Sequence, residues 1–194
     1  MKAYLEASEY IDWQTPNILN KAKELAQDLS NHQDITKTCF EFVRNNIKHS
    51  WDDQLNPVTC KASDILQHET GYCFAKSLLL AALLRANHIP TALCYQRLTI
   101  EVGKPPFSLH GFNAVFLPDF DWYRIDARGN KKDVDTQFIP HQEQLAFDTV
   151  YSGEIDFSQR FAKPLDIVVQ SLTKNKSFEE FANNLPDLKG LTQS

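Results

Sequence analysis

Non-polar residues recur at helical spacing in the first part of the chain. Steps of three and four residues place side chains on one face of a helix. The first run, at residues 16–30, follows a Thr-Pro pair typical of a helix start and contains Ile18, Leu19, Ala22, Leu25, Ala26 and Leu29. The second begins near Asp34, a possible cap, and contains Ile35, Cys39, Phe42, Val43 and Ile47. The pattern predicts two amphipathic helices before residue 48.

A third helical segment is non-polar on nearly every side. It follows Cys73 and reads FAKSLLLAALLRANHIP, in which residues of high helix propensity dominate. A helix that is non-polar all round is expected to be buried. Before it, residues 48–59 are polar and predict a loop, and residues 63–67 predict a short helix.

Beyond Pro90 the pattern changes to short segments rich in β-forming residues. These are TALCYQRL, HGFNAVFL and WYRIDA, with LPDFDW as a hairpin connection between the last two. Helices followed by a meander predict an α+β fold, in which N-terminal helices and a central Cys-bearing helix pack on an antiparallel sheet. After Arg128 the pattern weakens, and LDIVVQSLT and SFEEFANNL fit either helices against the sheet or a looser tail. We expect one domain over residues 1–194, with its core at about 34–135.

Composition and charge narrow the class of protein. The net charge is -5 and no basic run occurs, which disfavours a nucleic-acid partner. The longest non-polar stretch, residues 78–84, is far shorter than the about 20 residues of a membrane span. The N-terminus, MKAYLEASEYIDW, lacks the apolar region of a secretory signal, so we expect a cytoplasmic protein. The four cysteines show no CxxC pair, so we expect no metal site and no cofactor.

Cys73 is the candidate nucleophile. It lies at the start of the long non-polar helix, where unpaired backbone N–H groups and the helix dipole favour a thiolate. Those N–H groups can also stabilise an oxyanion. By position alone, a cysteine near a helix start is more often structural than catalytic.

His110 and Asp126 are candidate partners of Cys73. We expect His110 to open a strand after a loop that contains Gly103, Pro105 and Pro106, and Asp126 to lie near the end of the next strand. A buried carboxylate needs a partner, and His110, Arg124 or Arg128 could supply it. Nucleophile, base and orienting carboxylate form the set that covalent catalysis requires.

Strand register tests whether His110 and Asp126 can meet. An even loop that pairs Leu117 with Trp122 would point the two side chains to opposite faces of the sheet. An odd loop of residues 118–120 places Asp126 opposite Phe112, and Asp126 then shares a face with His110 as a diagonal neighbour. The three residues therefore require an odd loop, a bulge or a bend at Gly111.

The motifs around these residues resemble the transglutaminase-like superfamily, whose catalytic architecture is similar to that of papain-type proteases. The resemblance covers GYCFAKSLLLAALLRANHIPT, HGFNAVFL and WYRIDARGN, with FEFVRNNIKHSWD as the lead-in helix. His88 stands where the family commonly has glycine. The resemblance implies that Cys73 is the nucleophile, His110 the base and acid, and Asp126 the orienting residue. It also implies an oxyanion residue upstream, for which Trp51 and Gln54 are both candidates.

Remaining polar residues are interpreted as structural. Cys94 is assigned to the sheet core, Cys39 to a helix face and Cys60 to a loop. We expect exposed side chains at His49, His68, His88 and His141. Residues 128–131 are interpreted as a polar turn in preference to a part of the site.

The expected function is thiol-dependent acyl transfer on a peptide or amide substrate through a thioacyl intermediate, with hydrolysis favoured. The alternatives are a catalytically idle peptide-binding module of the same fold, a transamidating transglutaminase and an arylamine-acyltransferase-like enzyme. The Arg-Gly-Gly-x-Cys motif of the last class is absent. The sequence specifies neither the substrate nor the oligomeric state.

Overall fold

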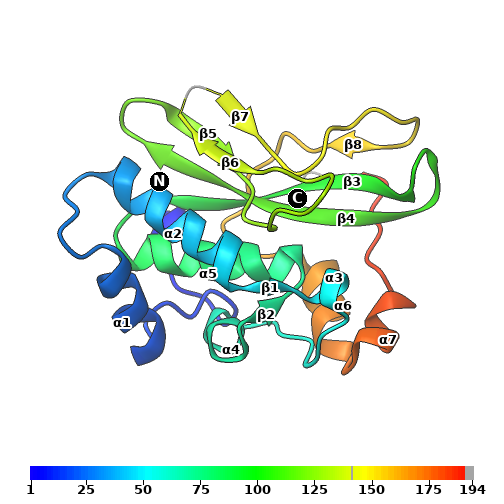
Figure 1. Cartoon of the computed structure of the whole chain (residues 1–194), viewed down its shortest axis with the longest axis horizontal. Coiled ribbons are helices and arrows are strands. Elements are labelled where there is room, and N and C mark those ends of the chain that lie inside the picture. The colour runs from blue at the N-terminus through cyan, green and yellow to red at the C-terminus, as the bar shows by residue number, and fades with distance from the viewer. Residues whose placement is uncertain (141, 191–194) are drawn as a thin grey trace.

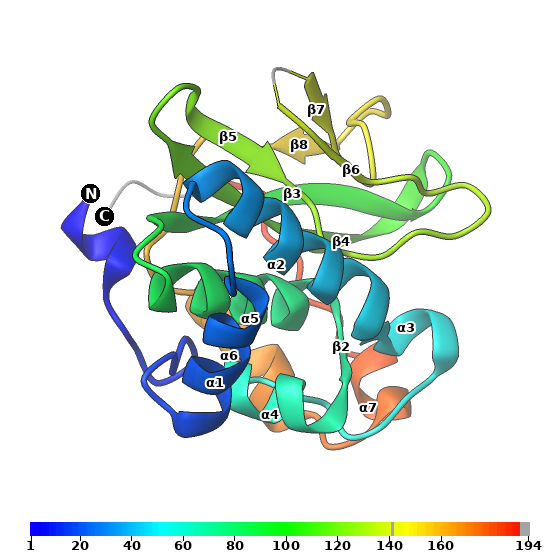
Figure 2. The same cartoon turned by 60° about the vertical axis from the view of Figure 1, so that its left-hand side comes forward.

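The computed structural model describes residues 1–140 and 142–190. Helices cover one face of an antiparallel sheet, so the expected α+β arrangement is confirmed (Figures 1 and 2). The helical elements are the 3-10 helix η1 (Lys2–Leu5), α1 (Pro16–Leu25), α2 (His32–Asn46), α3 (Ser50–Asp53), α4 (Ala62–His68), α5 (Cys73–Ala86), α6 (Asp166–Lys174) and α7 (Phe178–Ala182). The strands are β1 (Lys48–His49), β2 (Thr70–Gly71), β3 (Thr91–Glu101), β4 (Lys104–Leu117), β5 (Asp121–Ile125), β6 (Gln137–Ile139), β7 (Gln142–Gln144) and β8 (Ile155–Asp156). His141 lies outside the described residues.

Helix α5 is the centre of the fold. It lies between the sheet and the helices α1, α2 and α4 (Figure 1), and its residues from Phe74 to Arg85 are buried. At its end the buried Arg85 guanidinium donates to the carbonyl oxygens of Glu6, Thr91 and Ala162. Within the described ranges, no helix combines the length and the apolar character needed to cross a bilayer. The expectation of a buried central helix is confirmed.

The expected bounds of the first two helices need correction. Helix α1 ends at Leu25 rather than near residue 30, because the chain turns there and Asp28 takes a left-handed φ of 62°. Helix α2 is capped by Asn31, whose side chain accepts a hydrogen bond from the Asp34 N–H. Asp34 is a first-turn residue, where the helix dipole favours a carboxylate.

Residues 48–59, expected to be a loop, contain two short elements. Strand β1 pairs with β2 in parallel, with Lys48 opposite Thr70 and His49 opposite Gly71. Helix α3 follows directly. The segment was misinterpreted because a two-residue strand carries no periodicity that a sequence pattern can reveal. The pairing holds residues 48 and 49 beside the start of α5.

The main sheet has the strand order β5-β4-β3-β8. Strands β3 and β4 form a long hairpin, in which Glu101 pairs with Lys104 around a turn at Val102 and Gly103. Strand β4 therefore begins at Lys104, and His110 lies inside it rather than at its start. The prolines that suggested a loop lie at the register shift between Thr99 and Glu101, where missing N–H donors are tolerated.

The C-terminal segment forms helices α6 and α7 below the sheet, and α7 lies beside α3 (Figures 1 and 2). The Phe181 ring stacks on Tyr72 at 3.8 Å between centroids, and Phe178 contacts Trp51 at 5.7 Å. Beyond α7 the chain returns to the sheet, where the Leu109 N–H donates to the Pro186 carbonyl at 2.7 Å. Of the two alternatives left open for this segment, helices are correct.

Gly111 permits the close approach of β4 to the start of α5. A Cβ atom at this position would lie 2.8 Å from Phe74 Cδ1 and 3.1 Å from the Phe74 Cα. Because a backbone atom cannot move aside cheaply, we expect Gly111→Ala to lower the free energy of unfolding by about 1–3 kcal/mol. Thermal or urea unfolding measures this. In Gly190→Ala, the matched control, the added Cβ has no atom within 4 Å. Equal stability of the two variants would contradict the close packing at Gly111.

Candidate active site

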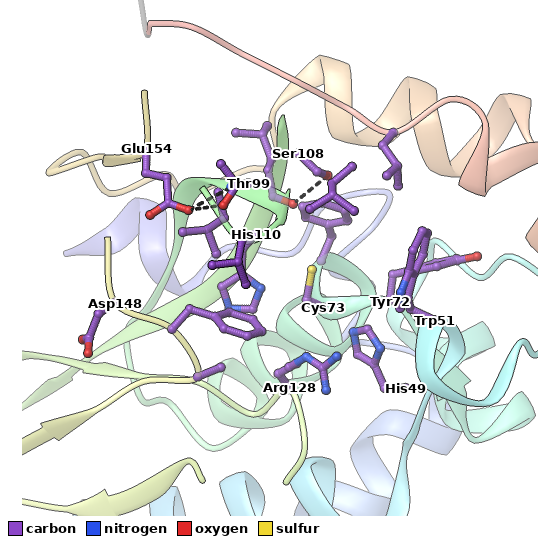
Figure 3. A pocket seen from close by; sticks show the side chains of 18 of the residues that line it. His49, Trp51, Tyr72, Cys73, Thr99, Ser108, His110, Arg128, Asp148 and Glu154 are labelled. Carbon is purple, nitrogen blue, oxygen red and sulfur yellow. Dashed lines mark hydrogen bonds between the residues drawn. The ribbon is translucent and has the colours of Figure 1, made fainter. Parts of the chain in front are cut away.

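The candidate site is a cavity of about 550 Å³ at the N-terminal end of α5. Its walls come from α5, the β3–β4 hairpin, residues 146–151 and the C-terminal segment. Cys73, His110, Arg128 and His49 project into it from four different elements or loops (Figure 3). This volume is in the range of small-ligand sites.

Cys73 is the first residue of α5 and differs from the other three cysteines in its surroundings. Its side chain is only partly buried and reaches the cavity, whereas Cys39, Cys60 and Cys94 are buried. Burial raises the pKa of each of those three thiols to about 12. They remain protonated near neutral pH and are poor nucleophiles.

His110 and Asp126 form a buried hydrogen-bonded pair. The His110 Nε2–H donates to Asp126 Oδ2 at 2.7 Å, and the carboxylate also accepts from the backbone N–H groups of Arg128 and Ala146 at 3.0 and 3.1 Å. The other imidazole nitrogen faces Cys73 (Figure 3), and the nearby thiol adds to the rise in the pKa of His110. The structure thus brings together all three residues that the sequence singled out.

The charges of the pair stabilise each other. Burial alone would lower the pKa of His110, but the Asp126 carboxylate and Cys73 together raise it well above its ordinary value. Burial alone would raise the pKa of Asp126, yet His110 and the two backbone donors lower it. The imidazolium form of His110 is therefore favoured at neutral pH, facing Cys73.

The odd loop explains how the pair forms. Leu117 pairs with Asp121 around residues 118–120, and Asn113 pairs with Ile125. Extended by one residue, this register places Asp126 opposite Phe112, on the same face of the sheet as His110. The odd-loop alternative required this arrangement. Among the described strands, β5 pairs with β4 only up to Asn113, and at Gly111 strand β4 approaches Phe74 at the start of α5.

Residues 128–131, interpreted as a plain turn, belong partly to the site. Arg128 lines the cavity and forms two hydrogen bonds with the Asp52 carboxylate, at 2.6 and 2.8 Å. Lys131 also pairs with Asp52 at 2.8 Å. Burial would raise the pKa of Asp52, but these cations lower it well below its usual range. The interpretation failed because Asp52 lies far away in the sequence.

His49 was expected to be exposed, but its imidazole is almost fully buried in the cavity wall. The β1–β2 pairing places it opposite Gly71, two residues before Cys73. Both ring nitrogens lack a hydrogen-bond partner among the described residues. Burial and the positive charge of Arg128 lower the pKa of His49 well below its ordinary value, so the ring is neutral.

Of the two residues considered for an oxyanion role, only Trp51 lines the cavity. Gln54 is exposed just after α3, with a left-handed φ of 51°.

The ammonium of Lys76, also missed from the sequence, is buried behind the site and donates to the Ile47 and Arg44 carbonyls. Burial lowers its pKa to about 7. Lys76 thereby holds the end of α2, which leads into His49.

Selective thiol reactivity follows from these surroundings. At pH 6 we expect iodoacetamide to alkylate Cys73 more than about 100-fold faster than Cys39, Cys60 or Cys94, because the thiolate is the nucleophile. Peptide mapping by mass spectrometry measures the four rates. His110→Ala should slow the reaction of Cys73 only in part, since the helix start remains. Unfolding in urea should remove the difference, and equal rates in the folded protein would contradict an activated Cys73.

A cysteine at a helix start that faces a histidine–carboxylate pair on an antiparallel sheet is the arrangement of papain-like thiol enzymes. Residues 20–127 match the transglutaminase-like superfamily, which is more than half of the 194 residues. The chain belongs to this superfamily, as its motifs predicted. Superfamily membership indicates thiol-dependent acyl-transfer chemistry without specifying a substrate.

Solved structures share the fold at low sequence identity. A candidate cysteine protease from Cytophaga hutchinsonii is 21% identical with a TM-score of 0.51, and the match covers 64% of this chain and 40% of that one. The periplasmic domain of TgpA from Pseudomonas aeruginosa is 18% identical (TM-score 0.49; 64% and 45% covered). Red sea bream transglutaminase is 14% identical (TM-score 0.39; 66% and 26% covered). The matched region thus spans less than half of each of these structures. A search of curated proteins finds no match.

Proposed function

We propose that this protein is a thiol-dependent hydrolase that cleaves an amide or peptide bond through a thioacyl intermediate. The observation that carries the proposal is the 2.7 Å hydrogen bond between a fully buried Asp126 and His110, which lines one cavity with Cys73. A carboxylate held by three donors fixes the imidazole in the orientation that a general base and acid needs.

In the proposed reaction the Cys73 thiolate attacks the carbonyl carbon and forms the C–S bond. The His110 imidazolium then gives its proton to the leaving nitrogen as the C–N bond breaks. A water molecule, deprotonated by His110, attacks the thioester, and the C–S bond breaks to release the carboxylic acid and restore the thiolate. Asp126 stabilises the imidazolium and stays ionised throughout.

His49 is the proposed side-chain donor to the oxyanion, together with the Cys73 backbone N–H at the helix start, which has no intrahelical partner. A neutral imidazole carries one N–H donor. Neither nitrogen of His49 forms a hydrogen bond with a described residue, and Nδ1 lies 3.7 Å from Asp52 Oδ2. Its place opposite Gly71 sets it beside the start of α5.

Substitution of His49 should therefore lower the rate without the loss of stability that a broken hydrogen bond would cause. We expect His49→Ala to lower kcat by roughly 10²–10³-fold with little change in KM, and His49→Gln, which keeps an N–H donor, to recover part of the loss. Because the buried nitrogens lack partners in the free protein, neither substitution should lower the melting temperature by breaking a hydrogen bond. A full kcat in His49→Ala would assign the oxyanion to other groups.

Product analysis separates hydrolysis from transfer. The protein is incubated with a p-nitrophenyl ester of an N-acetylated peptide, with and without glycine amide as an acceptor. We expect the free acid as the main product at every acceptor concentration. A dominant amide product would assign transamidation instead. No nitrophenolate release above that of Cys73→Ala would favour the idle binding module.

A further inference from the structure

The exposed non-polar side chains of this protein gather at the mouth of the candidate site. Among the described residues, the large exposed non-polar side chains are Met1, Leu19, Ile100, Val102, Ile139, Val150 and Tyr151. Four of these line the cavity: Ile100, Val102, Val150 and Tyr151. Val102 is 77% and Val150 is 68% exposed. Single exposed non-polar side chains are normal on a protein surface, whereas a group of them at a cleft marks a binding surface.

One wall of this surface begins beside His110. In the β3–β4 hairpin His110 pairs with Gln96. Leu98 and Ile100 follow on β3 at two-residue steps, which places them on the same face of the sheet as His110. Val102 continues the row in the hairpin turn. At about 3.3 Å per residue, the row from Leu98 to Val102 is roughly 13 Å long.

The opposite wall is held rigidly to the hairpin. The Glu154 carboxylate accepts hydrogen bonds from the backbone N–H and hydroxyl of Thr99 and from the N–H groups of Val150 and Tyr151. The Tyr151 ring packs at the hairpin turn, 3.2 Å from the position of a Cβ on Gly103. Residues 150 and 151 therefore face the row on β3 in a fixed position.

The charges near this groove disfavour an acidic occupant. The charged side chains that line the cavity on this side, Asp148 and Glu154, are both carboxylates. Arg128 and Lys131 in the lining are cationic, and both form ion pairs with Asp52. An acidic acyl group would therefore be repelled by the carboxylates along the groove. Neither Arg128 nor Lys131 is free to pair with it, because both already pair with Asp52.

We infer that the groove between Leu98–Val102 and residues 150–151 binds the acyl side of the substrate, and that the acyl side is an extended peptide with bulky non-polar side chains. The inference rests on the proposed function of the same site. It names the substrate class: a peptide whose residues on the N-terminal side of the cleaved bond are aliphatic or aromatic. About four extended residues match the length of the row.

A series of esters tests the inference. The substrates are N-acetyl-X-X-glycine p-nitrophenyl esters in which X is Gly, Ala, Val, Leu or Phe, so the reacting glycyl ester is the same throughout. We expect kcat/KM to rise at least about tenfold from Gly to Leu or Phe. In the double variant Val102→Ser with Val150→Ser the rise should fall to less than about threefold.

Leu19→Ser is the matched control, because it removes an exposed non-polar side chain from α1, away from the groove. It should keep the full preference for Leu and Phe. A flat series in the unmodified protein, or an equal loss of preference in Leu19→Ser, would overturn the inference.

Failure of the proposed function can be distinguished from failure of the inference about the groove. If no ester in the series acylates Cys73, binding of N-acetyl-Leu-Leu-glycine amide to the unmodified protein still reports on the groove, through NMR shifts of the Leu98, Ile100 and Val102 methyl groups. Absence of those shifts would overturn the inference by itself. Dimerisation in sedimentation that the Val102→Ser, Val150→Ser pair abolishes would also overturn it, and would assign the groove to a second copy of the chain.

Discussion

Cys73→Ala should reduce the turnover of an activated ester by roughly 10⁴-fold or more, to the rate of the uncatalysed reaction. No other described cysteine lies in the cavity, and burial raises the pKa of Cys39, Cys60 and Cys94 to about 12. None of them can replace the missing nucleophile. Release of p-nitrophenolate at pH 7, with the melting temperature as a check on folding, measures the effect.

Cys94→Ala is the control for the loss of a thiol. Cys94 does not line the cavity and packs with Phe112 and Ala114, so its removal should leave kcat unchanged within about twofold even if it costs stability. Retained turnover in Cys73→Ala would reassign the nucleophile, with Cys94 and Cys60 the next residues to test.

Asp126→Asn should lower kcat by roughly 10²–10⁴-fold, less than the loss in Cys73→Ala. Asparagine keeps the shape of the side chain and one accepting oxygen, but it removes the negative charge that stabilises the His110 imidazolium. The thiol remains, so some activity persists. Steady-state kinetics measure the loss, and Asp126→Ala should lower stability as well, because the Arg128 and Ala146 N–H groups lose their buried acceptor.

The pH dependence distinguishes an electrostatic role of Asp126 from a structural one. The carboxylate raises the pKa of His110, so His110 in the unmodified protein stays protonated to higher pH. In Asp126→Asn the pKa of His110 should fall, and the alkaline limb of the pH–rate profile should move to lower pH. A reduced kcat with an unmoved alkaline limb would limit Asp126 to a structural role.

Much of the candidate site could be predicted because local patterns encode it. Helix α5 is non-polar throughout, and the start of this run placed Cys73 correctly. The loop between β4 and β5 is short, so the sequence left open only whether it has an even or an odd number of residues. The structure has the odd loop of residues 118–120. His88, where the family commonly has glycine, takes a left-handed φ of 60° just after α5, as glycine does after a helix.

What could not be predicted depends on contacts between distant segments. His49 is buried by a two-residue parallel pairing of β1 with β2, which leaves no period in the sequence. Arg128 enters the site through an ion pair with Asp52, 76 residues earlier. The prolines near the start of β4 suggested a loop, because a sequence pattern does not show that they coincide with a register shift in a hairpin. The expected limits of a single domain over residues 1–194 stay a prediction.

The most direct test of the central claim is the identity of the acylated residue. The protein is mixed with N-acetyl-Leu-Leu-glycine p-nitrophenyl ester, quenched in acid within the first turnover and mapped by mass spectrometry. We expect one acyl group, bound as a thioester to Cys73, that forms in the unmodified protein and accumulates when Asp126→Asn slows its hydrolysis. Acylation at Cys39, Cys60 or Cys94, or nitrophenolate release without any acyl group on Cys73, would contradict the claim.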